Sequence, residues 1–192
     1  MMLIEVTWLG RGGQGVALAS RLIVEALNFE NKYAQSMIFF GAERRGAPVR
    51  AYSRISDTTI RYHHFVRRPD VFVVFSRELL SIERVFDEIK DGGTLIVNTP
   101  DLDAIRSYIP SDKRIKIGGV DANRISIDLN LKVAGLVVPN TVMLGAFSKI
   151  IGLPSLESLI KAIKHAWADN PKLADINSEA ARRGFENAQM FT

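Results

Sequence analysis

The segment that most constrains the fold is a glycine-rich loop that joins a strand pattern to a helix pattern near the start of the chain. Residues 3–9 are mostly β-branched, aromatic or leucine, a composition typical of a strand. Gly10, Gly12 and Gly15 follow in the spacing G-x-G-x-x-G. From residue 16 to residue 27, apolar side chains recur at the interval that lines one face of a helix. A strand, a glycine loop and a helix in this order predict the opening of a βαβ unit.

The rest of the chain continues the alternation of strands and helices. Alternating residues at 48–55 and 59–65, separated by a short polar turn, predict an antiparallel hairpin. The expected fold is therefore α/β, a Rossmann-like, doubly wound and mostly parallel sheet with an antiparallel hairpin and a helical C-terminal third. We expect residues 1–192 to form a single domain. Further strands are predicted at 32–36, 71–75, 94–97 and 114–117, and further helices at 121–129, 140–151, 155–167 and 173–190.

The composition excludes several classes of protein. The chain has 192 residues, of which 47% are apolar, and this is enough to bury a core. It has no cysteine, which excludes disulfides, thiolate catalysis and any iron–sulfur cluster ligated by this chain. No apolar run approaches the ~20 residues that a membrane-spanning helix needs, and the first residues lack the pattern of a signal peptide. We therefore expect a cytoplasmic protein that does not enter a membrane.

The positive charge is concentrated in one segment. The formal net charge is +4, but residues 44–68 contain seven arginines and one acidic residue, Asp57, and so carry +6. The remainder of the chain is slightly acidic. A local excess of arginine predicts a pocket for an anion or a subunit interface rather than diffuse attraction to anionic partners.

The glycine loop is the strongest candidate binding site. Glycines let a backbone approach a ligand, and the N-terminus of the following helix offers N–H groups and the positive end of its dipole to a phosphate. Two alternatives stay open. The loop could serve strand–helix packing alone, or it could bind NAD(P). A dinucleotide site expects an acidic residue at the end of the second strand, whereas Glu30 precedes that strand.

Arg44 and Arg45, in a loop rich in glycine, are suited to bind phosphate or carboxylate, although a solvent-exposed loop or a subunit interface would also explain them. No residues with the spacing of a nucleophile–base pair or a metal site are present. A nucleic-acid-binding protein is a third class, because Tyr52, Tyr62 and Phe65 lie among the arginines. The predicted alternation would place these rings on two strand faces, so we expect no nucleic-acid partner.

Four blocks of sequence, in this order, resemble one known family. They are Gly-Arg-Gly-Gly-Gln-Gly-Val at 10–16, Lys-Tyr-Ala-Gln at 32–35, Gly-Ala-Glu-Arg-Arg-Gly-Ala-Pro-Val-Arg-Ala at 41–51 and Pro-Asn-Thr-Val-Met-Leu-Gly-Ala at 139–146. The chain resembles the gamma subunit of 2-oxoacid:ferredoxin oxidoreductases over nearly its whole length.

The resemblance implies a role in a multi-subunit enzyme that oxidatively decarboxylates a 2-oxoacid, such as pyruvate, to an acyl-CoA and CO2 while reducing ferredoxin. It implies alpha, beta and delta subunits, or fused equivalents, as partners, and these would hold thiamine diphosphate, Mg2+ and the 4Fe–4S clusters. The chain itself would lack turnover and would help to bind coenzyme A. The resemblance leaves open which 2-oxoacid is used and whether the isolated chain is a homodimer; a free-standing NAD(P) oxidoreductase is the alternative function.

The expected coenzyme A site combines the loop, two arginines and a predicted helix start. The loop glycines and Gln14 would bind through the backbone, and the arginines would supply charge. Asn140 and Thr141 are equally well explained as a helix cap. The candidate residues are Gly10, Arg11, Gly12, Gly13, Gln14, Gly15, Arg44, Arg45, Asn140 and Thr141.

Overall fold

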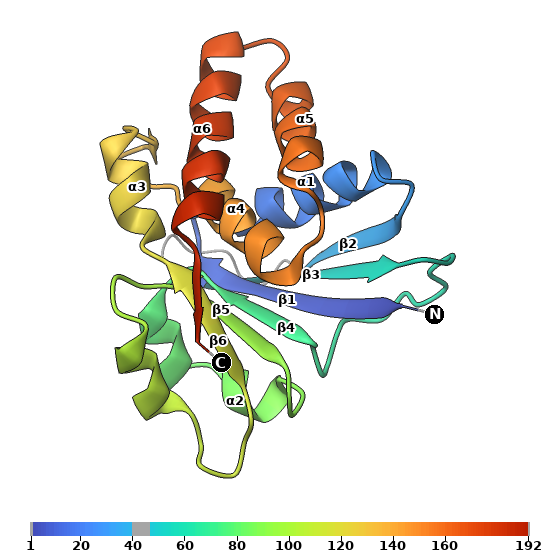
Figure 1. Ribbon diagram of the computed structural model, residues 1–192, viewed down its shortest axis with the longest axis vertical. Coiled ribbons are helices and arrows are strands. Elements are labelled where there is room, and N and C mark those ends of the chain that lie inside the picture. The colour runs from blue at the N-terminus through green and yellow to red at the C-terminus, as the bar shows by residue number, and fades with distance from the viewer. Residues whose placement is uncertain (1, 40–46, 192) are drawn as a thin grey trace.

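The protein is built around one twisted sheet with helices on both of its faces (Figure 1). The computed structural model describes residues 2–39 and 47–191. The sheet contains β1 (Leu3–Arg11), β2 (Tyr33–Phe39), β3 (Pro48–Ser56), β4 (Val71–Val74), β5 (Thr94–Asn98), β6 (Lys116–Val120) and β9 (Gln189–Phe191). The other elements are α1 (Val16–Asn28), α2 (Val85–Glu88), α3 (Ala122–Asp128), α4 (Asn140–Ile151), α5 (Leu156–Ala166), α6 (Pro171–Asn187), the 3-10 helices η1 (Arg77–Ser81) and η2 (Asp103–Tyr108), and a small hairpin of β7 (Lys132–Val133) and β8 (Leu136–Val137).

The sheet is mixed. Its order is β2-β3-β1-β4-β5-β6-β9. β1, β4, β5 and β6 are parallel neighbours and form its centre. β3 lies antiparallel between β1 and β2, and β9 closes the opposite side by pairing antiparallel with β6. The predicted α/β class, with parallel central strands and an antiparallel addition, is confirmed.

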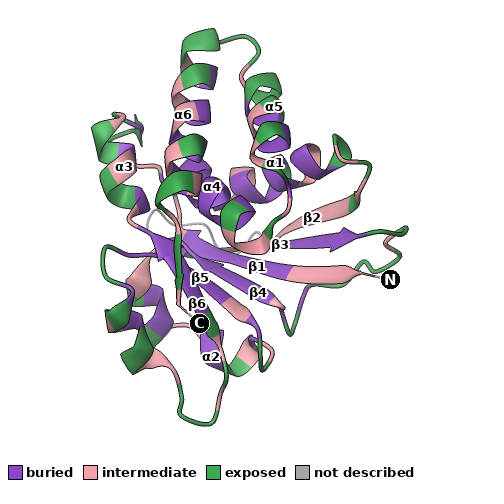
Figure 2. Cartoon of the chain, in the orientation of Figure 1, coloured by how far each residue is buried: buried purple, intermediate pink, exposed green. Residues whose placement is uncertain are grey.

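The central strands are apolar at every position because each face of the sheet carries its own core. In β4, Val71 and Val73 pack into the core beneath α1, α4, α5 and α6. Phe72 and Val74 point the other way, into a second core that η1, α2 and η2 cover. Successive side chains of a strand point to opposite faces, so an unbroken apolar run indicates a strand covered on both sides. Figure 2 shows these central strands as largely buried.

Two glycines bring α4 and α6 into backbone contact. A Cβ added to Gly145 would lie 2.0 Å from the carbonyl oxygen of Ala181, and one added to Gly184 would lie 2.1 Å from the carbonyl oxygen of Val142. Real Cβ atoms do not approach backbone oxygens so closely. The contact holds α4 between the sheet and α6, and explains why α4 is buried over most of its surface.

The structure corrects the predicted hairpin. β3 confirms a strand at 48–55, but its hairpin partner is β2, and residues 59–65 form no strand. A strand has two edges, and β1 and β2 already occupy both edges of β3. The segment after β3 therefore crosses a face of the sheet instead of extending it.

The helical C-terminal third is confirmed, with one correction at its end. Asp121 and Ser155 cap α3 and α5 as their side chains accept hydrogen bonds from Arg124 N and Ser158 N. The last helix, however, ends at Asn187 rather than at residue 190. The chain then turns into β9, because the free edge of β6 offers it backbone partners.

Candidate functional site at the glycine loop

The glycine loop lies where the chain connections change from one face of the sheet to the other. After β1 the chain enters α1, whose Ala19 and Ile23 belong to the first core. After the neighbouring strand β4 it enters η1, whose Leu79 and Leu80 belong to the second core. Ligands of open α/β sheets bind outside the carboxyl ends of two strands that diverge in this way. The fold thus places the loop at the position where a ligand crevice is expected.

The backbone of the loop explains two of its glycines. Gly13 and Gly15 have φ angles of +98° and +79°, in the left-handed region that side-chain-bearing residues rarely adopt. The turn is closed by a hydrogen bond from Gln14 N to Arg11 O (3.1 Å), and Gly12 N donates to Ala47 O (3.0 Å). Gly15 is the N-cap of α1, and no side chain caps this helix. The first N–H groups of α1 and its positive dipole end are therefore suited to an anion.

Gln14 fastens the loop to the end of β4. Its Oε1 accepts a hydrogen bond from Arg11 N (2.7 Å), and its amide group hydrogen-bonds to Ser76 Oγ. The side chain thus links the two diverging strands across the crevice. Its position indicates that it shapes the loop, while its backbone remains the part predicted to bind.

The structure brings Asn140 to the loop but not Thr141. A Cβ on Gly15 would lie 2.6 Å from Asn140 Nδ2, so the amide of the buried Asn140 rests against the loop. Asn140 Oδ1 accepts a hydrogen bond from Thr141 N (2.8 Å). Thr141 points the other way and donates its hydroxyl hydrogen to Asn177 Oδ1 on α6 (3.0 Å). Thr141 therefore ties α4 to α6 and reaches neither hollow beside the loop.

Two hollows flank the loop. One has a volume of about 660 Å³ and is lined by the loop, the first turns of α1 including Arg21, and Asn140. The other, of about 450 Å³, lies between Gln14 and the side chains of Asn123, Ile127 and Leu136. Both volumes fall in the range of small-molecule sites. The first is supplied with helix N–H groups and a guanidinium, and the second has a mainly apolar wall.

The β7–β8 hairpin stands over the loop between these hollows. Its turn is Ala134-Gly135, with both φ angles positive, as a tight two-residue hairpin requires. A Cβ on Gly13 would lie 2.8 Å from Leu136 Cδ1. Glycine at this position therefore lets the apolar tip of the hairpin pack directly on the loop.

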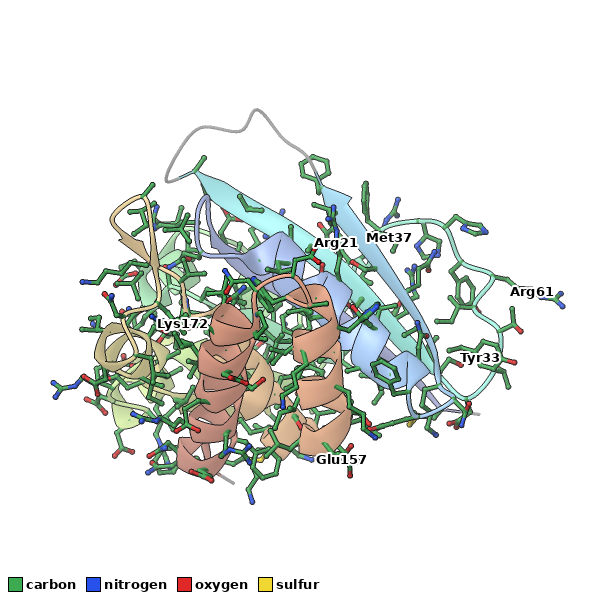
Figure 3. The ribbon with its side chains drawn as sticks, turned by 90° about the horizontal axis from the view of Figure 1, so that it is seen from above. Arg21, Tyr33, Met37, Arg61, Glu157 and Lys172 are labelled. Carbon is green, nitrogen blue, oxygen red and sulfur yellow. The ribbon has the colours of Figure 1, made fainter. Side chains whose placement is uncertain are left out.

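The charge around the loop is positive. Arg11 lines both hollows and Arg21 lines the larger one, and no acidic side chain is among the described residues that line them. Arg21 makes no ion pair with the part of the chain that the structure describes. Its position on the first turns of α1 can be followed in Figure 3. Sequence reasoning missed Arg21, although it is the sole basic residue of α1 and comes six positions after Gly15.

Two other arginines of the arginine-rich segment 44–68 form buried or half-buried ion pairs that stabilise the fold. Arg50 donates hydrogen bonds to Glu83 (2.8 Å) and Glu88 (2.7 Å). Burial works to lower the pKa of Arg50, but the hydrogen bonds to Glu88 and Glu83 raise it above its ordinary value. Arg54 is fully buried and pairs with Glu5 (2.9 Å). The predicted site residues Arg44 and Arg45 lie outside the described residues.

Two further sequence expectations can be compared with the described chain. Within residues 2–39 and 47–191, no group of three or more His, Asp or Glu side chains is placed to hold a metal ion. None of the helices over these same ranges is long and apolar enough to span a bilayer.

Comparisons with known proteins identify the family. Residues 5–187 match the family described as pyruvate ferredoxin/flavodoxin oxidoreductase. Pyruvate synthase subunit PorC of Methanothermobacter marburgensis is 40% identical over 184 residues, which cover 96% of this chain and 97% of the relative. The pyruvate/ketoisovalerate oxidoreductases common subunit gamma of Pyrococcus furiosus is 39% identical, with 98% and 99% covered.

Solved structures agree with this assignment. The crystal structure of pyruvate oxidoreductase subunit PORC from Thermotoga maritima superposes with a TM-score of 0.83 at 33% identity, covering both chains completely. A 2-oxoglutarate:ferredoxin oxidoreductase from Magnetococcus marinus, solved with 2-oxoglutarate, coenzyme A and succinyl-CoA bound, shares the fold over 96% of this chain and 30% of its own. Its TM-score is 0.74 at 19% identity. The chain therefore belongs to the pyruvate ferredoxin/flavodoxin oxidoreductase family, in the group of its gamma, or PorC, subunits.

Proposed function

We propose that this chain is the gamma subunit of an enzyme that oxidatively decarboxylates a 2-oxoacid to an acyl-CoA and CO2 with reduction of ferredoxin, and that its glycine loop helps to bind coenzyme A. The observation that carries the coenzyme A assignment is the uncapped N-terminus of α1, which opens between two hollows at the switch point of the sheet. Full-length similarity to subunits named PorC and gamma supports the enzyme class.

The chemistry of the two hollows suits the two ends of coenzyme A. Its phosphate groups need N–H donors and cations, which the start of α1 and Arg11 and Arg21 supply. Its pantetheine arm is long and largely uncharged, and suits the apolar wall formed by Ile127, Leu136 and Val137. A fold neighbour has coenzyme A bound, which is consistent with this assignment at the level of fold.

In this proposal the chain positions coenzyme A and the other subunits carry the redox groups. The sequence has no cysteine, so the iron–sulfur clusters would lie in delta or other subunits. Thiamine diphosphate and Mg2+ would be held by the alpha and beta subunits. The chain would work as one domain in the cytoplasm, and ferredoxin would accept electrons from the complex.

The NAD(P) alternative has less support from the geometry. A dinucleotide fold places the ribose-binding acid at the end of the strand that directly neighbours the first strand. Here the neighbour of β1 on that side is the antiparallel β3, whose Val49 lies opposite Gly10 and whose Pro48 lies opposite Arg11. Neither residue has a carboxylate, and Glu30, which follows the C-terminal end of α1, accepts a hydrogen bond from Ser155 N.

The proposal is tested in the reconstituted complex. Arg11→Ala with Arg21→Ala should raise KM for coenzyme A about 10-fold or more in a pyruvate-dependent dye-reduction assay, because each lost charge-assisted hydrogen bond is worth about 1.5–3 kcal/mol. Arg44→Ala with Arg45→Ala should act in the same direction. The matched control, Arg84→Ala with Arg182→Ala, removes exposed arginines elsewhere and should leave KM unchanged.

Two results would contradict the assignment. One is an unaltered KM for coenzyme A in a normally assembled complex that carries the Arg11 and Arg21 changes. The other is tight binding of NADH or NADPH to the isolated chain, measured by calorimetry, which would favour the dehydrogenase alternative instead.

A further inference from the structure

Exposed aromatic side chains gather at one edge of the sheet. Every exposed aromatic residue of the described chain lies on β2 or on the segments beside it, and each is 44–49% exposed. Aromatic residues and arginine are enriched in protein interfaces relative to the rest of the surface. These residues are Phe29, Tyr33, Phe39, Tyr62 and Phe65.

A segment without regular structure, residues 57–70, carries two of these rings and is held firmly against the sheet; we call it the strap. At one end Asp57 pairs with Lys32 on the turn before β2 (2.6 Å). At the other, Asp70 accepts a hydrogen bond from Glu5 N (2.8 Å). Between them the Phe65 ring packs on Tyr52 of β3, with centroids 5.2 Å apart. The strap is therefore fixed before any partner binds, which lowers the entropic cost of association.

Arg54 of β3 contacts the middle of the strap. Its guanidinium is fully buried, donates to Glu5 Oε1 (2.9 Å) and lies 3.3 Å from His64 Nδ1. The Tyr62 ring stacks over the same guanidinium at 5.7 Å. A buried arginine is costly unless its partners are well placed, so this network favours one position of the strap.

The outer side of the strap is basic. Arg61, Arg67 and Arg68 are exposed, and none of them forms an ion pair with a described residue. Both acidic residues of the strap are already paired, Asp57 with Lys32 and Asp70 with Lys90. The surface therefore presents uncompensated positive charge around its aromatic rings.

β2 adds an open strand edge to this surface. One of its edges pairs with β3, and no described strand pairs with the other. β2 has seven residues and none is charged, whereas β9 at the opposite edge has three. Natural proteins usually protect edge strands by keeping them short, by placing charged residues on them or by covering them. An open and uncharged edge of this length therefore indicates a surface that is covered in the working protein.

We propose that the strap and the exposed edge of β2 form the docking surface for an acidic face of another subunit of the same enzyme. The inference rests on the proposed function, which makes this chain one subunit of a complex. A second copy of the chain related by a two-fold axis would bring the same arginines together, and like charges at an interface oppose association. A single-stranded nucleic acid needs open ring faces, whereas Tyr62 covers Arg54 and Phe65 meets Phe39 edge-on at 84°.

The test reverses charge on the strap without touching its packing. Arg61→Glu with Arg68→Glu should raise the Kd for binding to the purified remaining subunits of the enzyme at least 10-fold. The Kd is measured by analytical ultracentrifugation at 100 mM NaCl. The control is Lys164→Glu with Lys172→Glu, which changes the net charge equally on α5 and α6; Figure 3 shows Lys172 on the opposite side of the molecule from Arg61. The control should change the Kd less than 3-fold.

The outcomes separate the possibilities. Equal Kd values for the two double variants overturn the inference. So does a second result: the wild-type chain self-associates, and Arg61→Glu with Arg68→Glu abolishes this self-association but leaves binding to the other subunits intact. Binding of a 20-nucleotide single-stranded RNA that the strap variant loses, with subunit binding unchanged, also overturns it. If the wild-type chain does not bind the other subunits, the result counts against the proposed function as well. If the wild-type chain binds them and the strap variant binds with the same Kd, the docking surface alone is refuted. Arg67→Gln, which removes one charge, should give a smaller loss of affinity in the same direction.

Discussion

Gly15→Ala tests the geometry of the candidate site at its tightest point. Gly15 has φ +79° and begins α1. A methyl group there meets two penalties. The left-handed backbone costs an alanine about 1–2 kcal/mol, and the new Cβ would lie 2.6 Å from Asn140 Nδ2 and 3.0 Å from Asn140 Cβ. Forcing extra atoms into a packed site costs about 1–3 kcal/mol.

The two penalties together predict a loss of roughly 2–5 kcal/mol in the free energy of unfolding. For a chain of this size, 1 kcal/mol corresponds to about 2–4 °C in Tm, so the melting temperature should fall by roughly 4–20 °C. Urea denaturation gives the free energy, and KM for coenzyme A in the reconstituted complex should rise as the loop shifts away from the start of α1.

Gly92→Ala is the matched control. Gly92 has nearly the same φ, +76°, but no atom lies within 4 Å of an added Cβ, so this variant should show the backbone penalty alone. Gly15→Ala combined with Asn140→Ala should recover part of the excess loss, with a coupling free energy of about 1–2 kcal/mol. If Gly15→Ala costs no more than Gly92→Ala, Asn140 does not pack on the loop and the reasoning is refuted.

Three further predictions concern the frame of the site. Gly145→Ala should lower the free energy of unfolding, measured by urea denaturation, by about 3 kcal/mol or more, because the new Cβ would lie 2.0 Å from a backbone oxygen of α6 that cannot shift without moving the helix. A loss below about 1 kcal/mol would contradict the helix contact. Arg54→Met should lower the free energy of unfolding by about 3–5 kcal/mol, because it removes the closer ion-pair partner of Glu5 and leaves only Lys90 at 3.7 Å. Glu5→Gln in the same chain should restore part of the loss; no restoration would argue against the pair. A hydrogen bond from Lys32 lowers the pKa of Asp57, so the folded carboxylate adds stability above its ordinary pKa and loses it as the pH falls. Asp57→Asn should therefore be destabilising at pH 7, and this destabilisation should shrink as the pH falls through the lowered pKa of Asp57, in unfolding curves at low salt. An effect that does not change with pH would contradict this.

The sequence predicted those parts of the fold in which local pattern and tertiary structure agree. The unbroken apolar run at 71–75 predicted a strand covered on both faces, and β4 has one core on each side. The alternation at 59–65 led to a wrong prediction, because whether such a segment becomes a strand depends on a free strand edge nearby. The pairing of β3 with both β1 and β2 removed that edge, and no local pattern reports this.

The candidate site was predicted in its backbone and missed in part of its side chains. The G-x-G-x-x-G spacing located the loop because Gly15 is required by its backbone angle and Gly10 by close packing, where an added Cβ would lie 2.5 Å from Val16 Cγ2. Arg21 and Leu136 reach the same place from a helix face and from a distant hairpin. Their position depends on how α1 is rotated and on how residues 132–137 fold back, which a motif search does not include.

The position of α4 has a consequence for synthesis of the chain. Phe147 on α4 packs against Trp8 of β1, with ring centroids 5.1 Å apart. Translation completes β1 to β6 before residues 140–187. In the growing chain on the ribosome, α1 and α3 are therefore the only helices available to this face of the sheet until the last quarter of the described chain emerges. Exposed apolar sheet faces aggregate, so the nascent polypeptide needs shelter in that interval, and fragments that stop before residue 140 should accumulate as insoluble material.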